Sequence, residues 1–294
     1  MRLARTTLGR LRWTLVLALA LAAACAGAPA RAARTDRAAE KIGWRLSLQC
    51  WTFNQLTLFE TIEKAQALGI RYIEMFPGQK LRPDSEALAD HAMKPEDREA
   101  LKRKLKEAGI KVVNYGVVGL GKDEAGSRQV FDFAKEMGIE TICSEPSEDA
   151  FDTVEKLCDE YHINVAIHNH PKPSHYWDPD TVLAACKGRS KRIGACADTG
   201  HWARSAVDPL EALRKLEGRI VTFHFKDLNE LSPGAHDVPW GTGASNAKAL
   251  LAEMRRQRFK GAFSIEYEHN TPELVDNLAR CAAFFDQTAA ELAR

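Results

Sequence analysis

The stretch "GACADTGHW", residues 194–202, decides the fold. It reads as a strand of small residues that runs into Asp198, turns at Gly200 and then presents His201 and Trp202. Strand-to-loop units of this kind are typical of parallel α/β proteins, in which polar side chains gather at strand ends. An acid and an imidazole three residues apart at such an end indicate a site, and its nature depends on the neighbouring strands.

The same pattern recurs eight times from Trp44 onward: a short β-branched or aromatic run, a polar loop, and an amphipathic helix that ends near glycine. Strict alternation predicts parallel strands with right-handed crossovers. Eight units in about 250 residues predict a single-domain α/β fold, the (β/α)8 TIM barrel. An open doubly wound sheet would need a Gly-rich loop after its first strand, and "CWTFNQLT" is not one. The strands are expected at 44–53, 70–76, 111–118, 140–145, 164–170, 192–198, 220–226 and 262–268.

The N-terminus has the pattern of a secretory signal. Four arginines precede an apolar run from Trp13 to Cys25, and small residues follow. We therefore predict a cleaved signal peptide at 1–32, a flexible tail at 33–43 and the barrel at 44–294, with a bacterial periplasmic or secreted location and no membrane association beyond export. A membrane anchor is less favoured because the apolar run is short for a bilayer span. A lipid-modified Cys25 is less favoured because Ala22 stands where a lipoprotein signal prefers Leu.

The charge balance bears on the partners. Residues 1–32 hold five arginines and no acid, so their removal leaves 36 of the 41 basic residues against 40 acidic ones. A mildly acidic protein is a poor partner for nucleic acid. The expected partner is a small carbohydrate, and homo-oligomerisation stays open. The cysteines show no CxxC or Cys/His metal spacing and are interpreted as buried thiols.

Polar side chains stand at the ends of most of the predicted strands. Residues two apart on a strand face the same way. On the last strand this places the acids inward and the apolar set under the helices, and on the strand before it the polar set is again inward. Several acids and imidazoles thus converge on one cavity, where a bound divalent cation would offset the cost of burying them. The acids and imidazoles at the strand ends are Glu74, Glu145, His168, His170, Asp198, His224, Glu266 and Glu268, and Lys226 stands among them.

The motifs "ACADTGHW", "HFKD", "PWGTG" and "SIEYE", in this order, resemble the sugar phosphate isomerase/epimerase superfamily, whose barrel is similar to xylose isomerase. The resemblance spans the predicted mature chain. It implies one Mn, Mg, Co or Zn ion held by two Glu, one Asp and one His. By position, Asp198, His224 and Glu266 match three of these ligands, and His201 matches an imidazole that contacts substrate hydroxyls.

One departure concerns the first Glu of such relatives, which often ends the fifth strand. Here that place holds His168 in "AIHNHP", and the nearest unassigned inward acid is Glu145. Either Glu145 completes the ligand set or His168 coordinates the metal itself. We favour Glu145, and both alternatives stay open at this point.

The resemblance implies sugar chemistry through an enediolate, formed when a base removes a proton beside a carbonyl. Glu145 or Glu266 would be the base, and His168 or His170 would return the proton. Substrate contacts are expected from His201, Lys226, Glu74 and Trp51. The favoured activity is isomerisation or epimerisation of a non-phosphorylated sugar or keto-sugar.

Three alternatives are weaker. The same enolate chemistry would serve a lyase or hydratase acting on 3-keto-glycosides, and a non-catalytic carbohydrate-binding protein would keep the fold alone. A nuclease resembling endonuclease IV would need histidines on the second and third strands, where Glu74 and Asn114 stand.

Overall fold

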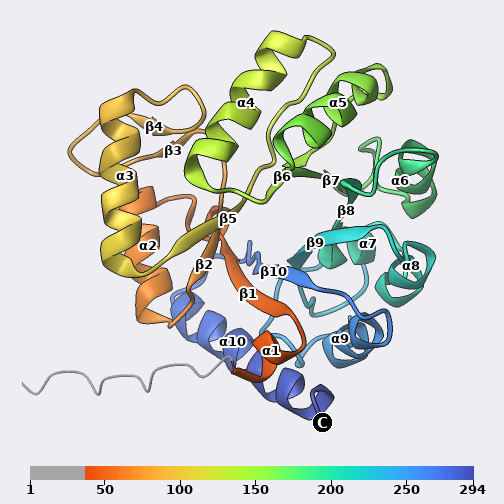
Figure 1. Cartoon of the computed structure of the whole chain (residues 1–294). Helices are drawn as coiled ribbons and strands as arrows, with labels where there is room; N and C mark the ends of the chain where they lie inside the picture. Colours follow the sequence, from red (N-terminus) through yellow and green to blue (C-terminus); the bar gives the residue numbers. More distant parts are fainter. Residues whose placement is uncertain (1–36) are drawn as a thin grey trace, which may run out of the picture. The chain divides into compact units, whose positions relative to one another are not determined.

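Eight parallel strands close into a barrel in the computed structural model, which describes residues 37–294 (Figure 1). The predicted signal peptide at 1–32 lies outside the described residues. Around the barrel the order is β1-β10-β9-β8-β7-β6-β5-β2. The predicted TIM barrel is thereby confirmed. Its strands are β1 (Trp44–Gln49), β2 (Tyr72–Met75), β5 (Lys111–Tyr115), β6 (Thr141–Ser144), β7 (Asn164–His168), β8 (Ile193–Asp198), β9 (Ile220–Phe225) and β10 (Gly261–Ile265).

Helices surround the barrel on its outside (Figure 1). Pro95, Pro179 and Pro209 each stand in a first helical turn, where a missing N–H costs nothing. Gly109 and Gly138 end two helices with φ of 67° and 71°, a conformation that favours glycine. None of the described helices has the length and apolar character needed to cross a membrane. They are α2 (Leu58–Ala67), α3 (Pro95–Ala108), α4 (Glu124–Met137), α5 (Phe151–Tyr161), α6 (Pro179–Cys186), α7 (Thr199–Arg204), α8 (Pro209–Lys215), α9 (Ala247–Arg256) and α10 (Leu274–Leu292), with 3-10 turns η1 (Cys50–Phe53) and η2 (Glu148–Ala150).

Two features differ from the sequence-based expectation. A short hairpin of β3 (Gln79–Lys80) and β4 (Leu88–Ala89) lies between β2 and α3. The segment 33–43, expected as a flexible tail, contains helix α1 (Arg37–Lys41), and Ala39 in it is only 1% exposed within the main hydrophobic core. Elements this short carry too few residues for a periodic pattern, and tertiary contacts hold them.

The two faces of the strands separate an apolar outer layer from a polar interior. On the outer face, the rings of Phe223 and Phe263 stack with centroids 4.7 Å apart, and Phe263 packs against Phe285 of α10. Inside the barrel, the amide of Asn114 donates to Thr222 Oγ1 at 2.8 Å. The alternation predicted from the last two strands therefore holds, and it directs polar groups into the barrel.

We predict that Gly194→Ala lowers the free energy of unfolding by about 1–3 kcal/mol in urea denaturation, because overpacking forces the backbone to shift. An added Cβ at Gly194 in β8 would lie 2.1 Å from the carbonyl oxygen of Arg219 and 2.7 Å from Val221 Cγ2. Gly119→Ala is the matched control, since nothing lies within 4 Å of its added Cβ. Equal stability of both variants would contradict this account of the close approach of β8 and β9.

Candidate active site

Four side chains converge at the C-terminal ends of β7, β8, β9 and β10. His168, Asp198, His224 and Glu266 each offer one ligand atom, and these atoms lie within 4.8 Å of one another. All four residues are buried. The parallel register explains the meeting, because Asp198 pairs directly with His224 across β8 and β9. As predicted, the side chains of Asp198, His224 and Glu266 lie close together. His168 is the fourth member of the group.

Two imidazole nitrogens in this group lack a hydrogen-bond partner although they are buried: His168 Nε2 and His224 Nδ1. His168 Nε2 lies 3.5 Å from Asp198 Oδ2, and His224 Nδ1 lies 3.2 Å from Glu266 Oε2. Ligands bound at about 2.1 Å to one cation are separated by distances of this size. Buried imidazole nitrogens that face carboxylates at these distances fit a divalent cation between them, since the cation would satisfy all four groups.

Each of these histidines is anchored on its other nitrogen by a carboxylate. His168 Nδ1 lies 3.0 Å from Glu145 Oε1, and His224 Nε2 lies 2.7 Å from Glu74 Oε1. Carboxylates in this position orient a metal-ligating imidazole and fix its tautomer. Glu74 is fully buried, and it also accepts hydrogen bonds from Asn114 and Ser264.

This geometry bears on two expectations. Glu145 was favoured as the fourth ligand, but it lies outside the four-residue group and contacts the two histidines His168 and His170. Glu145 contacts Nδ1 of His168, whereas Nε2 of that ring faces Asp198. Glu145 forms a separate group of possible ligand atoms with His168 and His170. His168, the other alternative, belongs to both groups, so we take it as the candidate fourth ligand. Glu74 was expected at the substrate, yet it lies beneath His224 and is 0% exposed.

Lys226 occupies the centre of the acidic group. Its Nζ lies 2.6 Å from Asp198 Oδ2, 2.6 Å from Glu266 Oε2 and 3.4 Å from Glu268 Oε2, and its side chain is fully buried. Burial acts to lower the pKa of Lys226, but Asp198 and Glu266 outweigh burial and raise it well above the usual value. The lysine is therefore an ammonium ion already paired with carboxylates, not the free substrate ligand that was expected.

His170 and His201 lie at the rim of the cluster, with their ring centroids 5.4 Å apart. The backbone N–H of His201 donates to Asp198 Oδ1 at 2.7 Å, which caps α7. Burial lowers the pKa of His201 well below the ordinary value, so its imidazole is neutral. The side chain of His170 is 48% exposed. His201 Nε2 lies 3.5 Å from Asp198 Oδ2 and its Nδ1 lies 3.3 Å from a guanidinium nitrogen of Arg204, so the exposed imidazole of His170 is the better placed of the two to contact a ligand at the mouth.

Trp51 lies two residues beyond the end of β1 and is 43% exposed. Its ring packs edge-on against Phe76, and it lines a cavity of about 270 Å³ together with Tyr267 and Glu268. An exposed indole with a fixed orientation offers an apolar face to a sugar ring. By contrast, Trp202 and Trp240 are buried in the core.

Two polar residues at strand ends, for which the sequence predicted no role, organise the site. Asn169 bridges β7 and β8, since its side chain accepts from the N–H of Asp198 and donates to the Asp198 carbonyl oxygen. Asp227 accepts from the N–H groups of Gly241, Gly243 and Ser245 at 2.9–3.1 Å. The amides of the "PWGTG" loop are therefore committed to Asp227. The polar residues directly after His168 and Lys226 were the available signal for both.

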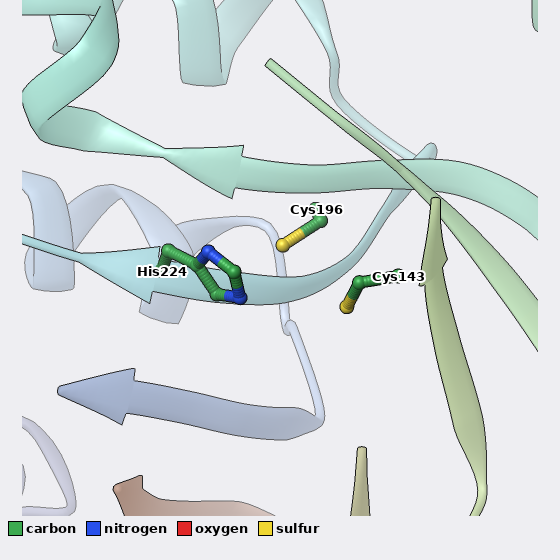
Figure 2. Close-up of side chains that lie close together, drawn as sticks. All are labelled: Cys143, Cys196 and His224. Atoms are coloured by element: carbon green, nitrogen blue, oxygen red, sulfur yellow. The ribbon is translucent and has the colours of Figure 1, made fainter. Parts of the chain in front are cut away.

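A second group lies within the barrel, where Cys143 of β6 and Cys196 of β8 face His224 (Figure 2). The six described cysteines are all free and buried. Burial raises the pKa of Cys143 well above its ordinary value, so this thiol is protonated and a poor metal ligand. Burial acts to raise the pKa of Cys196, but Cys143 and His224 outweigh it and lower the pKa to about 6, so the group offers one thiolate. The unpartnered Nδ1 of His224 also lies 3.2 Å from Glu266. We therefore take the four-residue group as the candidate centre.

Comparison with known proteins places the chain in a family. Residues 62–286 match the family described as the xylose isomerase-like TIM barrel, and the chain belongs to it. A comparison with curated proteins gave no match.

Three solved structures illustrate the similarity. A putative uncharacterised protein from Parabacteroides distasonis is 36% identical, with a TM-score of 0.67 over 83% of this chain and 98% of that one. A D-tagatose 3-epimerase-like protein is 17% identical, with a TM-score of 0.66 over 84% and 99%. A xylose isomerase-like TIM barrel protein from Mycobacterium smegmatis, in complex with magnesium, is 14% identical, with a TM-score of 0.69 over 86% and 99%.

The position of Glu145 leads to a pH-dependent prediction. Burial acts to raise the pKa of Glu145, but hydrogen bonds from His168 and His170 outweigh it and hold the pKa at about 2. A lowered carboxylate pKa adds stability that is present above the unfolded value near 4.5 and is lost as the pH falls toward 2. We expect Glu145→Gln to be less stable than the wild type by up to about 3 kcal/mol at pH 6. Both proteins are measured by urea denaturation in a chelator, and a difference that stays constant from pH 6 to pH 2.5 would refute the assignment.

Proposed function

We propose that the protein is a metal-dependent isomerase or epimerase of a non-phosphorylated sugar or keto-sugar. His168, Asp198, His224 and Glu266 would hold one divalent cation, Mn, Mg, Co or Zn. The observation that carries the proposal is the pair of buried, unpartnered imidazole nitrogens that face two carboxylates. Membership of the xylose isomerase-like family and the magnesium complex of a structural neighbour support it.

The cation, when bound, supplies a Lewis acid that stabilises negative charge on sugar oxygens. The chain's own residues move the protons. Glu266 has an 8% exposed side chain at the mouth and serves as the base that removes a proton beside the carbonyl, which leaves an enediolate. His170, backed by Glu145 on its Nδ1, returns the proton from the rim. Return to the same carbon on the other face epimerises, and return to the neighbouring carbon isomerises.

The positively charged side chains near the site favour a substrate without phosphate. Lys226 is held by Asp198 and Glu266, and Arg204 is paired with Asp237 and Glu268. Both cations are thus neutralised by carboxylates of the chain, and a phosphate group would have to displace these partners. Trp51 and the neighbouring cavity suit an uncharged ring instead.

A lyase or hydratase acting on 3-keto-glycosides is the second candidate, and one observation favours it. His168 stands where relatives often carry a Glu, so Glu266 is the one glutamate in the four-residue group. Epimerisation needs proton transfer on two faces, whereas elimination needs one base and an acid for the leaving group. The exposed imidazole of His170, with Glu145 behind it, suits that acid.

The four proposed metal ligands predict how much bound metal each variant retains. Asp198→Asn, His168→Ala and His224→Ala should each reduce bound metal at least about tenfold, since a ligand is lost. Elemental analysis after dialysis measures the metal, and circular dichroism checks the fold. Glu145→Gln is the comparison variant, because it removes a carboxylate that orients His168 but no proposed ligand, and it should lose less metal than the ligand variants do. If His168→Ala kept its metal while Glu145→Gln lost it, Glu145 would be the fourth ligand.

Proton exchange in deuterated water tests the reaction. The protein is incubated with a panel of ketoses, aldoses and 3-keto-glycosides, and the labelled carbon is located by NMR. We expect deuterium at the carbon beside a carbonyl with Mn²⁺ present, and at least about a hundredfold slower exchange in Glu266→Gln. Loss of a β-substituent would identify the lyase. Tight sugar binding without exchange or turnover would instead indicate a non-catalytic binding protein.

A further inference from the structure

Lys226 contacts the same two oxygen atoms that would bind the metal. Its Nζ lies 2.6 Å from both Asp198 Oδ2 and Glu266 Oε2. These oxygens also face the unpartnered nitrogens of His168 and His224. The ammonium thus satisfies two members of the four-residue group electrostatically and leaves the two imidazoles unsatisfied. The ammonium supplies, at the same two oxygen atoms, part of the positive charge that a divalent cation would supply.

The position of the lysine is fixed by the packing of its stem. An added Cβ at Gly200 would lie 2.6 Å from Lys226 Cδ and 2.8 Å from its Cβ, so the aliphatic chain lies directly on this glycine. Thr199 Oγ1 accepts from the backbone N–H of Lys226 and donates to its carbonyl oxygen, each at 2.8 Å. The ammonium is consequently held at the carboxylates by the junction of β9 with α7.

The charges around the group show why such a cation is needed. Asp198 and Glu266 are buried carboxylates brought close together, and Glu268 lies within 3.4 Å of the same ammonium. Buried like charges repel strongly unless an opposite charge neutralises them. In the metal-free protein Lys226 lies 2.6 Å from both ligand carboxylates, closer than His224 Nδ1 at 4.0 Å and 3.2 Å, and a metal ion must share or take over the contacts of the lysine.

We propose that Lys226 is a built-in counter-cation of the metal centre, which holds Asp198 and Glu266 in place before the metal binds and competes with the metal for the same oxygens. The inference rests on the metal site of the proposed function. It assigns the lysine a positioning role that sets how tightly the divalent cation is held. The bound metal would therefore exchange readily, and the metal-free barrel would keep its ligands arranged.

The experiment compares the wild type with Lys226→Met by isothermal titration calorimetry with Mn²⁺ on chelator-treated protein. Loss of a positive charge next to two ligand oxygens should tighten Mn²⁺ binding at least about tenfold. The metal-free variant should also melt at a lower temperature than the metal-free wild type, and it should gain more from added Mn²⁺. Lys226→Gln, which lacks the charge but keeps a hydrogen-bond donor, serves if the methionine variant does not fold without metal.

Lys64→Met is the control, because Lys64 borders the Trp51 cavity but makes no contact with the four-residue group. It should leave Mn²⁺ affinity unchanged. Unchanged or weaker Mn²⁺ binding in a folded Lys226 variant would overturn the inference and leave the lysine a structural role. Absence of Mn²⁺ binding in both wild type and variant would overturn it as well. Metal binding without turnover of any sugar would contradict the proposed function alone, so the two failures are distinguishable.

Discussion

The constraint on which the site depends is the burial of several carboxylates at one end of a barrel. Parallel closure brings the ends of all eight strands to one mouth, and Asp198, Glu266 and Glu74 are each less than 9% exposed there. Ionised groups so placed are tolerated only when opposite charges or hydrogen-bond donors compensate them. The remaining polar residues of the mouth serve this compensation, and their arrangement decides what the mouth can bind.

His168 and His224 each contact one carboxylate outside the four-residue group and face one carboxylate inside it. His224 contacts the buried Glu74 through Nε2 and faces Glu266 through Nδ1, and His168 contacts Glu145 through Nδ1 and faces Asp198 through Nε2. Each ring is thus fixed by a carboxylate on one side and leaves one nitrogen directed into the group. Such preorganisation costs nothing at the moment of binding, because the orientation is already set by the fold.

Strand alternation explains what could be predicted and where prediction ends. It placed Asp198, His224 and Glu266 on inward faces, and the parallel register then made their meeting unavoidable. Alternation gives the side of a strand but not the depth within the barrel, which is why Glu74 proved to lie beneath His224. Alternation also does not say which partner a side chain meets, and Glu145 contacts His168 and His170 instead of Asp198 and Glu266. The short elements α1, β3 and β4 carried too little pattern to be found.

The charge of the centre connects the departure from related proteins with the chemistry. Relatives with two Glu, one Asp and one His would carry three negative ligand charges, whereas the group here has two carboxylates and two imidazoles. Burial acts to lower the pKa of both histidines, but neighbouring acidic groups outweigh it and raise both values, so the imidazoles share the compensation of the carboxylates with the ammonium of Lys226. Extra positive charge at the mouth attracts an oxyanion more strongly than a neutral site does. In the proposed centre, an imidazole in place of a carboxylate and the ammonium of Lys226 would both reduce the attraction for a divalent cation, and both would favour negative charge that develops on a bound substrate.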